Sequence, residues 1–411
     1  AGSGAPGYAE GGFEEARFDQ PQGMALSADG SILYVADLGN HAVRALDLNE
    51  RTVTTLAGTG EQSPVYPPRA GDTSAVVLSS PWDLLLVGDV LHVAMAGSHQ
   101  LWGIDLVSGE AAALAGSGRE GVGEGAARDV ALAQPSGLAA DPAGNVYWAD
   151  SESSSIRVLH PDGTVSLLAG SADGLFDFGL RDGSGDDVRF QHPLGVAFAD
   201  GRLFVADTYN SVIRVIDVAT GGVTTLSGSG AGWSDGPMPQ FNEPGGIVFA
   251  GGRLYVADTN NHSIRVVDPV SGAATTLVLF GIEQYRAPDL ASEAIRLDPV
   301  VAAPGEHRLE VAVRLPDGYV LNDLAPLHVE WSGGVDSGEF SAIAPNSPIT
   351  LTLSGLTGDS AVVRIDLTVY YCTANAKELC LIDQAAYELP LTVAAGGAAG
   401  SGLEHVVVVA G

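Results

Sequence analysis

Short apolar runs alternate with glycine-rich polar turns along the first two thirds of the chain. The runs are rich in β-branched residues and bounded by Gly, Asp and Asn, which favours strands over helices. One stretch recurs: Tyr255-Val-Ala-Asp-Thr-Asn-Asn-His-Ser-Ile-Arg265 has counterparts that begin at Tyr34, Tyr147 and Phe204, and a weaker one at His92. Repetition of this kind predicts an all-β fold built from similar units.

Each repeat opens with a Phe or Leu followed three residues later by a proline. The five prolines are Pro21, Pro81, Pro135, Pro193 and Pro244. A short apolar strand, the Tyr-Val-Ala-Asp strand, an Ile-Arg-Val-x-Asp strand and a Val-Thr-Thr-Leu strand follow in order. Four short antiparallel strands in a unit of roughly 50–60 residues are typical of a propeller blade. We therefore predict five full blades over residues 21–279.

The flanking segments complete the expected organisation. Residues 1–20 resemble the inter-blade sequence at 114–118, so we expect a remnant of a preceding blade with its loop, and six blades in the intact protein. Residues 280–294 are predicted to be a linker. From residue 295 to 411 apolar and polar residues alternate with period two, which indicates half-buried antiparallel strands and favours an immunoglobulin-like β-sandwich domain.

The repeat resembles the NHL repeat. The resemblance is carried by Pro-x-Gly at the first strand, Tyr-Val-Ala-Asp-x-x-Asn-His, Ile-Arg-Val-x-Asp and Val-Thr-Thr-Leu-Ala-Gly. The irregular second repeat (Ser80-Pro-Trp-Asp83, then Ala94-Met-Ala-Gly-Ser-His99) is similar to one family, that of NHL-repeat-containing protein 2 and its bacterial relatives. That resemblance implies a thioredoxin-like domain, a six-bladed propeller and a small β domain in the intact protein. The sequence here lacks the thioredoxin-like domain and most of the first blade.

Composition and charge narrow the classes of partner. The chain has 19 basic and 50 acidic residues, a net charge of −31. Such a surface repels phosphate backbones and anionic lipids, so nucleic-acid and membrane-surface partners are not expected. There is also no apolar run of the length that spans a bilayer, about 18 residues.

A histidine register is the first candidate for chemistry. His41, His99 and His262 occupy the same position, one residue after the polar turn, where two other repeats carry Ser154 and Ser211. Three imidazoles with an open position suit catalytic zinc, an arrangement that resembles the peptidylglycine amidating lyases. The alternative is ordinary repeat sequence whose imidazole packs or hydrogen-bonds in a turn.

Two further registers are charged. Asp37, Asp150, Asp207 and Asp258 are expected to cap their own turns rather than to form a cation-binding ring. Arg44, Arg157, Arg214 and Arg265 are expected to form a ladder of ion pairs between blades. The second repeat replaces these residues with Met95 and Trp102.

Two candidates lie outside the registers. Asp182, Ser184 and Asp186 have the one-three-five spacing of calcium loops, without the glycine and glutamate that complete such a loop; a solvated glycine-rich loop is the alternative. Cys372 and Cys380, the chain's two cysteines, end one strand and begin the next, which permits a local disulfide. Structural or idle cysteines are the alternative to a redox pair. They resemble a cysteine pair in the last domain of the family and, more loosely, the periplasmic domain of the DsbD reductases.

Three functions follow from these candidates. The first is a non-enzymatic binding scaffold, whose propeller face binds a protein or small ligand and which accompanies a thioredoxin-like domain in the intact protein. The second is a zinc-dependent lyase or hydrolase that uses His41, His99 and His262. The third is thiol-disulfide exchange through Cys372 and Cys380. The first reading requires no cofactor, and zinc and calcium belong to the alternatives.

Overall fold

The computed structural model describes residues 1–277, 294–315, 319–321, 326–343, 348–356, 360–373 and 380–406. The chain divides into two compact units, Ala1–Val278 and Leu279–Gly411. The linker expected at 280–294 lies, apart from residue 294, outside the described residues. Among the helices described, none has the length and apolar character that a bilayer crossing requires.

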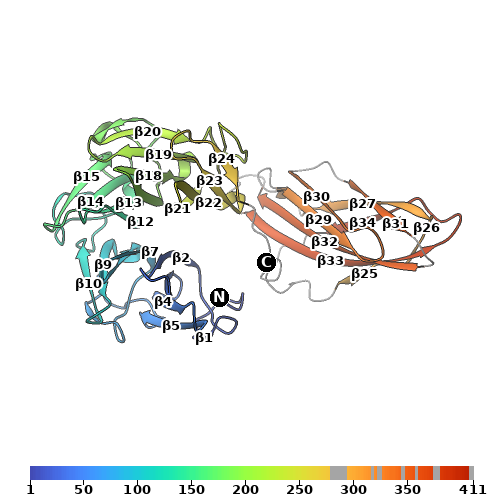
Figure 1. The fold of residues 1–411 in the computed structure, drawn as a ribbon, viewed down its shortest axis with the longest axis horizontal. Helices are drawn as coiled ribbons and strands as arrows, with labels where there is room; N and C mark the ends of the chain where they lie inside the picture. Colours follow the sequence, from blue (N-terminus) through green and yellow to red (C-terminus); the bar gives the residue numbers. More distant parts are fainter. Residues whose placement is uncertain are drawn as a thin grey trace. The chain divides into compact units, whose positions relative to one another are not determined.

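The first unit consists of five antiparallel sheets that follow one another around a common centre (Figure 1). The first sheet contains β1 (Gly11–Gly12), β2 (Pro21–Leu26), β3 (Ile32–Asp37), β4 (Ala42–Asp47) and β5 (Thr52–Ala57). The second contains β6 (Gly71–Asp72), β7 (Pro81–Val87), β8 (Val90–Met95), β9 (Gln100–Asp105) and β10 (Glu110–Ala115). The third contains β11 (Gly125–Ala126), β12 (Pro135–Ala140), β13 (Val146–Asp150), β14 (Ser155–Leu159) and β15 (Thr164–Gly170).

The last two sheets repeat this plan. The fourth contains β16 (Gly183–Ser184), β17 (Gly195–Ala199), β18 (Arg202–Asp207), β19 (Val212–Asp217) and β20 (Gly222–Ser227). The fifth contains β21 (Pro244–Ala250), β22 (Arg253–Asp258), β23 (Ser263–Val267) and β24 (Ala274–Thr276). Short 3₁₀ turns follow the second long strand: η1 (Ala96–Ser98), η2 (Ser151–Ser153), η4 (Thr208–Asn210) and η5 (Thr259–Asn261); η3 (Gly185–Asp187) lies between β16 and β17. The predicted all-β propeller of five blades is confirmed.

A short outermost strand was not predicted. In four sheets, two residues of the preceding loop pair with the last long strand, as β1 does with β5, and in the fifth Gly236 bridges Ala274. These residues are mostly glycine and carry no apolar alternation. Residues 1–20, expected to be a remnant and a loop, therefore supply β1 to the first blade.

The cores lie between neighbouring sheets. Tyr147 and Ala149 of the third blade pack with Val196 and Val205 of the fourth in one cluster. Because both faces of an inner blade are covered, burial does not alternate along its strands, and all five residues of β13 are buried. Packing between blades, rather than within them, therefore holds the ring together.

The first and fifth blades each have one face that lacks this cover. Met24 of β2 is 59% exposed, whereas Val196, in the same register of the fourth blade, is 4% exposed. On the opposite face of the fifth blade, Val248 is 56% exposed, whereas its counterpart Ala197 is 6% exposed. At each internal junction, one face of a blade packs against the opposite face of the next blade. One of these faces is exposed on the first blade, and the other is exposed on the fifth.

The second unit is a two-sheet sandwich. Its larger sheet contains β25 (Ile295–Arg296), β26 (Val300–Ala302), β28 (Tyr319–Leu321), β29 (Pro326–Ser332), β30 (Gly338–Ile343), β32 (Ser360–Thr373) and β33 (Cys380–Val393). Its smaller sheet contains β27 (Gly305–Arg314), β31 (Ile349–Leu356) and β34 (Gly400–Val406). Leu309 and Leu353 of the smaller sheet pack against Val329 and Ile365 of the larger in one buried cluster.

The prediction that all these strands are antiparallel is wrong. β34 runs parallel to β27, and β25 and β26 run parallel to β33. Alternation with period two reports which face of a strand is buried and carries no information about the direction of its neighbour. The immunoglobulin-like character of this sandwich stays a prediction.

Candidate binding face of the propeller

The repeated aspartates fix the point where the chain enters each blade. The carboxylates of Asp37, Asp150, Asp207 and Asp258 are fully buried at the ends of β3, β13, β18 and β22. Asp37 Oδ1 accepts a hydrogen bond from the amide of Asp19 at 2.7 Å, two residues before the first proline. The amides of Ala133, Gln191 and Asn242 make the same bond in the other blades. The cap thus serves the incoming strand as well as the turn, where Asn40 donates to Asp37 Oδ2.

The repeated arginines pair with these aspartates inside one blade, so the predicted ladder between blades is wrong. Arg44 Nη1 lies 2.9 Å from Asp37 Oδ2, and Arg214 Nη1 lies 2.8 Å from Asp207 Oδ2. The pairing is intra-blade because the two residues lie on adjacent antiparallel strands, with Val205 directly opposite Arg214. Arg265 pairs with Asp258 in the same way.

The arginines also hold the inter-blade loops. Arg214 donates to the carbonyls of Arg189 and Arg181, and its guanidinium lies 5.0 Å from the centre of the Phe190 ring. Asn210 adds a bond to the carbonyl of Gly179. A fully buried ion pair with backbone partners therefore ties residues 179–190 to the turn of the fourth blade.

Two blades depart from this arrangement. In the second, Met95 Sδ accepts the amide of Ser79 at 3.4 Å, and Trp102 donates to Gln100, so an uncharged set replaces the ion pair. In the third, Arg157 Nη1 lies 3.8 Å from Asp150 Oδ2, farther than in the first, fourth and fifth blades. Burial raises the pKa of Asp150, and the charge of Arg157 and the hydrogen bonds from Ala133, Ser153 and Trp148 oppose this.

The histidine register forms contacts between blades. His41 Nδ1 accepts the amide of Ser80 at 3.0 Å, and His99 Nδ1 accepts the amide of Gln134 at 3.1 Å. Where serine stands in the register, Ser154 Oγ accepts the amide of His192 at 3.1 Å. In each case the donor precedes the opening proline of the next blade. We call this contact the latch.

The three histidines are not gathered for zinc in the part of the chain that the structure describes. There, the one group of three or more metal-ligating side chains within reach of one another is on the second unit. His41 and His99 each use Nδ1 in a latch, and the backbone at His41, His99 and His262 is left-handed, with φ of 48°, 51° and 49°. His41 and His99 thus belong to separate junctions rather than to a common site.

The candidate calcium residues are also separated in their contacts. Asp182 lies 2.7 Å from Arg214 Nη2 and accepts the amide of Thr225, so it completes the ion-pair network of the fourth blade. Ser184 ends β16, and Asp186 lies exposed in η3.

The cysteines meet at the end of a strand ladder. The backbones of Cys372 in β32 and Cys380 in β33 are directly opposite each other. Opposed residues of an antiparallel pair have Cα atoms about 4.5–5.5 Å apart, which lies within the range of a disulfide.

A polar cluster lies on the same end of the blades as the Asp turns. The rings of His192 and Tyr209 stack with centroids 4.6 Å apart, and His192 Nδ1 lies 3.9 Å from Glu152 Oε1. Burial lowers the pKa of His192, although Glu152 and Glu243 oppose this. Burial also raises the pKa of Tyr209, and both glutamates add to the effect. The third, fourth and fifth blades thus contribute to one group.

Exposed apolar side chains also stand on three of the inter-blade loops. Tyr66 lies in the loop 58–80, Phe176, Phe178 and Leu180 in the loop 171–194, and Trp233 and Met238 in the loop 228–243; all six are exposed, Phe176 by 89%. We call these six side chains the apolar loop set. Exposed apolar side chains on loops are frequent at interaction surfaces.

Comparison with known proteins identifies the family of the repeat. A family model described as the NHL repeat matches residues 241–267, which comprise β21, β22 and β23. The chain is an NHL-repeat β-propeller protein. Human NHL repeat-containing protein 2 is 35% identical over 448 residues, covering 94% of this chain and 61% of that protein. Protein SUPPRESSOR OF QUENCHING 1, chloroplastic, of Arabidopsis thaliana is 35% identical over 425 residues, covering 95% and 40%.

The chain therefore spans roughly two to three fifths of the length of these relatives. Among solved structures, a nidogen/laminin complex is 17% identical with a TM-score of 0.45, covering 64% of this chain and 81% of that chain. A likeness of that degree adds nothing to the assignment.

Sequence reasoning missed one residue of the NHL propeller. Asp83 of β7 stands where the other inner strands carry Gly23, Gly137, Gly195 and Gly246. Its Oδ2 accepts the amide of Leu138 in the third blade at 2.8 Å, and it packs so closely on Gly23 that a Cβ there would lie 1.9 Å from Asp83 Oδ1. Burial raises its pKa to about 7. The signal was an acid at the glycine of Pro-x-Gly.

Proposed function

We propose that the NHL propeller is a non-enzymatic module that binds a protein through the face formed by its Asp turns and inter-blade loops. The apolar loop set is the observation that carries this proposal. Six exposed apolar side chains, four of them aromatic, lie on three inter-blade loops, and Arg214, Asn210 and Asn261 hold two of these loops, 171–194 and 228–243, in place. NHL propellers typically bind proteins, which agrees with this use.

The charge of the loops indicates the character of the partner. The loop 171–194 has two arginines and five aspartates, namely Arg181, Arg189, Asp173, Asp177, Asp182, Asp186 and Asp187. Aromatic anchors inside an acidic rim favour a segment that combines Lys or Arg with apolar side chains. The rim charges should mainly affect the association rate and its dependence on salt.

The test uses the full chain and fluorescein-labelled amphipathic peptides in which Leu or Phe alternates with Lys or Arg. Fluorescence anisotropy should show saturable binding that the double substitution Phe176→Ser with Phe178→Ser weakens at least about tenfold, since buried aromatic anchors contribute 1 kcal/mol or more each. The matched control is Val107→Ser, because Val107 is 80% exposed in the turn between β9 and β10, at the other end of the blade. Absence of binding, or equal loss in both variants, would contradict the proposal.

In the intact protein we infer that this module accompanies a thioredoxin-like domain. This inference rests on the resemblance of the sequence to the family of NHL-repeat-containing protein 2, which implies such a domain. Cross-linking mass spectrometry on the intact protein should then give cross-links between that domain and the loops 58–80, 171–194 or 228–243. Cross-links confined to other surfaces would leave the two domains functionally separate.

The opposed cysteine backbones favour a second candidate function, thiol-disulfide exchange. In this reaction the dithiol of a thioredoxin-type protein would reduce a Cys372–Cys380 disulfide and become a disulfide itself. Alkylation followed by intact mass measurement should show no labelled thiol before reduction and two afterwards. Cys380→Ser should leave Cys372 labelled throughout and abolish the exchange. Two labelled thiols in the air-oxidised wild type would exclude this function.

A further inference from the structure

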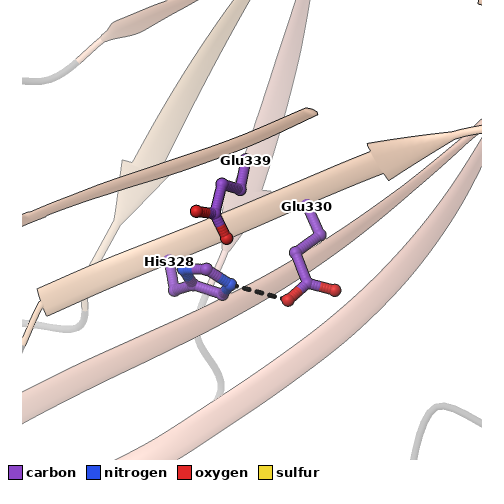
Figure 2. Close-up of side chains that lie close together, drawn as sticks. All are labelled: His328, Glu330 and Glu339. Atoms are coloured by element: carbon purple, nitrogen blue, oxygen red, sulfur yellow. Dashed lines mark hydrogen bonds and ion pairs between the residues drawn. The ribbon is translucent and has the colours of Figure 1, made fainter. Parts of the chain in front are cut away.

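We propose that His328, Glu330 and Glu339 of the second unit form a binding site for a divalent transition-metal ion, with zinc as the best fit. These residues lie on the hairpin of β29 and β30 (Figure 2). One ligand atom from each lies within 4.8 Å of the other two. The site is separate from the propeller and from its histidine register.

The backbone brings the three side chains to one face. His328 and Glu330 are two residues apart in β29, and the alternating neighbours Leu327 and Val329 are buried in the sandwich core. Glu330 is directly opposite Glu339 of β30, and His328 is opposite Ser341. All three side chains therefore leave the sheet on the face away from the core.

The distances suit a metal after small side-chain rotations. His328 Nε2 lies 2.8 Å from Glu330 Oε1, as the dashed line in Figure 2 shows. Ligands held at about 2.1 Å in a tetrahedron around zinc lie roughly 3.4 Å apart. The observed range, from 2.8 Å to below 4.8 Å, brackets that spacing.

The charges around the hairpin favour a cation at this place. Two carboxylates directly opposite each other on neighbouring strands repel. On the other side of β29, Asp366 of β32 is opposite Glu330. Arg364 pairs with Asp366 through Nε and Nη2 at 2.9–3.0 Å. A divalent ion bound by His328, Glu330 and Glu339 would offset the repulsion between the two opposed glutamates.

The donor set selects the class of metal. An imidazole nitrogen with two carboxylate oxygens suits zinc and its neighbours, whereas calcium and magnesium prefer oxygen ligands alone. Glu339 is exposed, and the side chain of His328 is 24% exposed, so water or a ligand from a partner can fill the fourth position. Three protein ligands with an accessible fourth position are typical of open zinc sites.

The test is calorimetric titration of the untagged full chain with zinc at pH 7.5, repeated with cobalt to record its visible absorption. We expect one zinc per chain at this site. Glu339→Gln and His328→Ala should each weaken binding at least about tenfold and remove the cobalt spectrum, because even partners that only support metal ligands contribute 10–100-fold. Circular dichroism checks that both variants fold.

Two controls separate this site from others. Glu310→Gln removes an exposed carboxylate from β27 in the smaller sheet, and His41→Ser removes an imidazole from the propeller. Neither should change the zinc affinity. No saturable binding up to about 1 mM zinc, or an unchanged affinity in Glu339→Gln, would overturn the proposal.

Discussion

Asp83 should make the propeller less stable as the pH rises through neutrality. Its carboxyl sits between the inner strands of the first three blades, where burial raises its pKa from 3.8 to about 7. A group whose pKa is raised by folding contributes stability below its unfolded pKa and loses that contribution as the pH rises through the folded pKa. The sensitive window therefore runs from about pH 4 to pH 7 and slightly above.

The magnitude follows from the shift. Each pKa unit corresponds to about 1.4 kcal/mol, so a rise from 3.8 to about 7 corresponds to roughly 4 kcal/mol of lost stability at alkaline pH. About 2.5 kcal/mol of this should be lost between pH 5 and pH 8. Asp83 keeps some solvent contact, so these values are upper limits.

The assay compares the wild type with Asp83→Asn, which keeps an oxygen for the amide of Leu138 and cannot ionise. Guanidinium unfolding followed by tryptophan fluorescence reports the propeller through the buried Trp102 and Trp148. The variant should gain stability over the wild type by up to about 2.5 kcal/mol between pH 5 and pH 8.

The control is Asp105→Asn in the same blade. Hydrogen bonds from the amides of Ser108 and Val107 lower the pKa of Asp105, so its contribution should be constant from pH 5 to pH 8. If the difference between wild type and Asp83→Asn is equally flat, the carboxyl of Asp83 does not titrate in this range and the reasoning fails.

Two further predictions concern the contacts that hold the blades. His41→Ser should cost less than about 1 kcal/mol at pH 7.5, because serine fills the latch in two other blades, whereas His41→Ala should cost about 1 kcal/mol or more through the lost acceptor of the Ser80 amide. Burial lowers the pKa of His41, so its latch should weaken as the pH falls below about 6.5. Thermal unfolding at pH 7.5 and pH 5 should show that the stability of His41→Ser rises relative to the wild type at the lower pH. A difference in stability that does not change with pH would contradict this. Arg214→Ala should destabilise the propeller by about 3–5 kcal/mol, because it leaves Asp207 buried without its ion pair. The double variant Asp207→Met with Arg214→Trp introduces the pair found in the second blade. It should recover at least half of the lost stability, as measured by denaturant unfolding. A double variant no better than Arg214→Ala would show that the uncharged set depends on its own blade.

The repeat made the propeller predictable, because Tyr-Val-Ala-Asp and Ile-Arg-Val fix strand length, register and turn in one phrase. The direction of β34 was not predictable, since alternation identifies the buried face of a strand and not the strand beside it. The partner of Arg44 was misassigned because the register of two strands has to be known before side chains seven residues apart can be paired.

Site residues were predictable only where the signal is local. The His–x–Glu spacing of His328 and Glu330 is visible in the sequence, but the position of Glu339 opposite Glu330 depends on hairpin register. The latch shows the same limit, since the donor to His41 lies 39 residues away in another blade. The occurrence of serine and histidine at the same position of the repeat was the available sequence signal, because both side chains can accept a hydrogen bond.

In the latch a backbone amide of one blade donates a hydrogen bond to a side chain of the preceding blade. Its donor is the backbone amide of the residue before each opening proline, so the hydrogen bond does not use that residue's side chain. The left-handed backbone there, with φ of 50–54°, disfavours β-branched residues. In the four latched positions these are Ser80, Gln134, His192 and Glu243, a small polar, an amide, an aromatic and an acidic residue. Within the limit set by that backbone, the same junction can therefore form with different residues at this position. The residues at these five positions, Gln20 included, vary among the blades while the rest of the repeat stays similar, so binding specificity can differ here between proteins that share the scaffold.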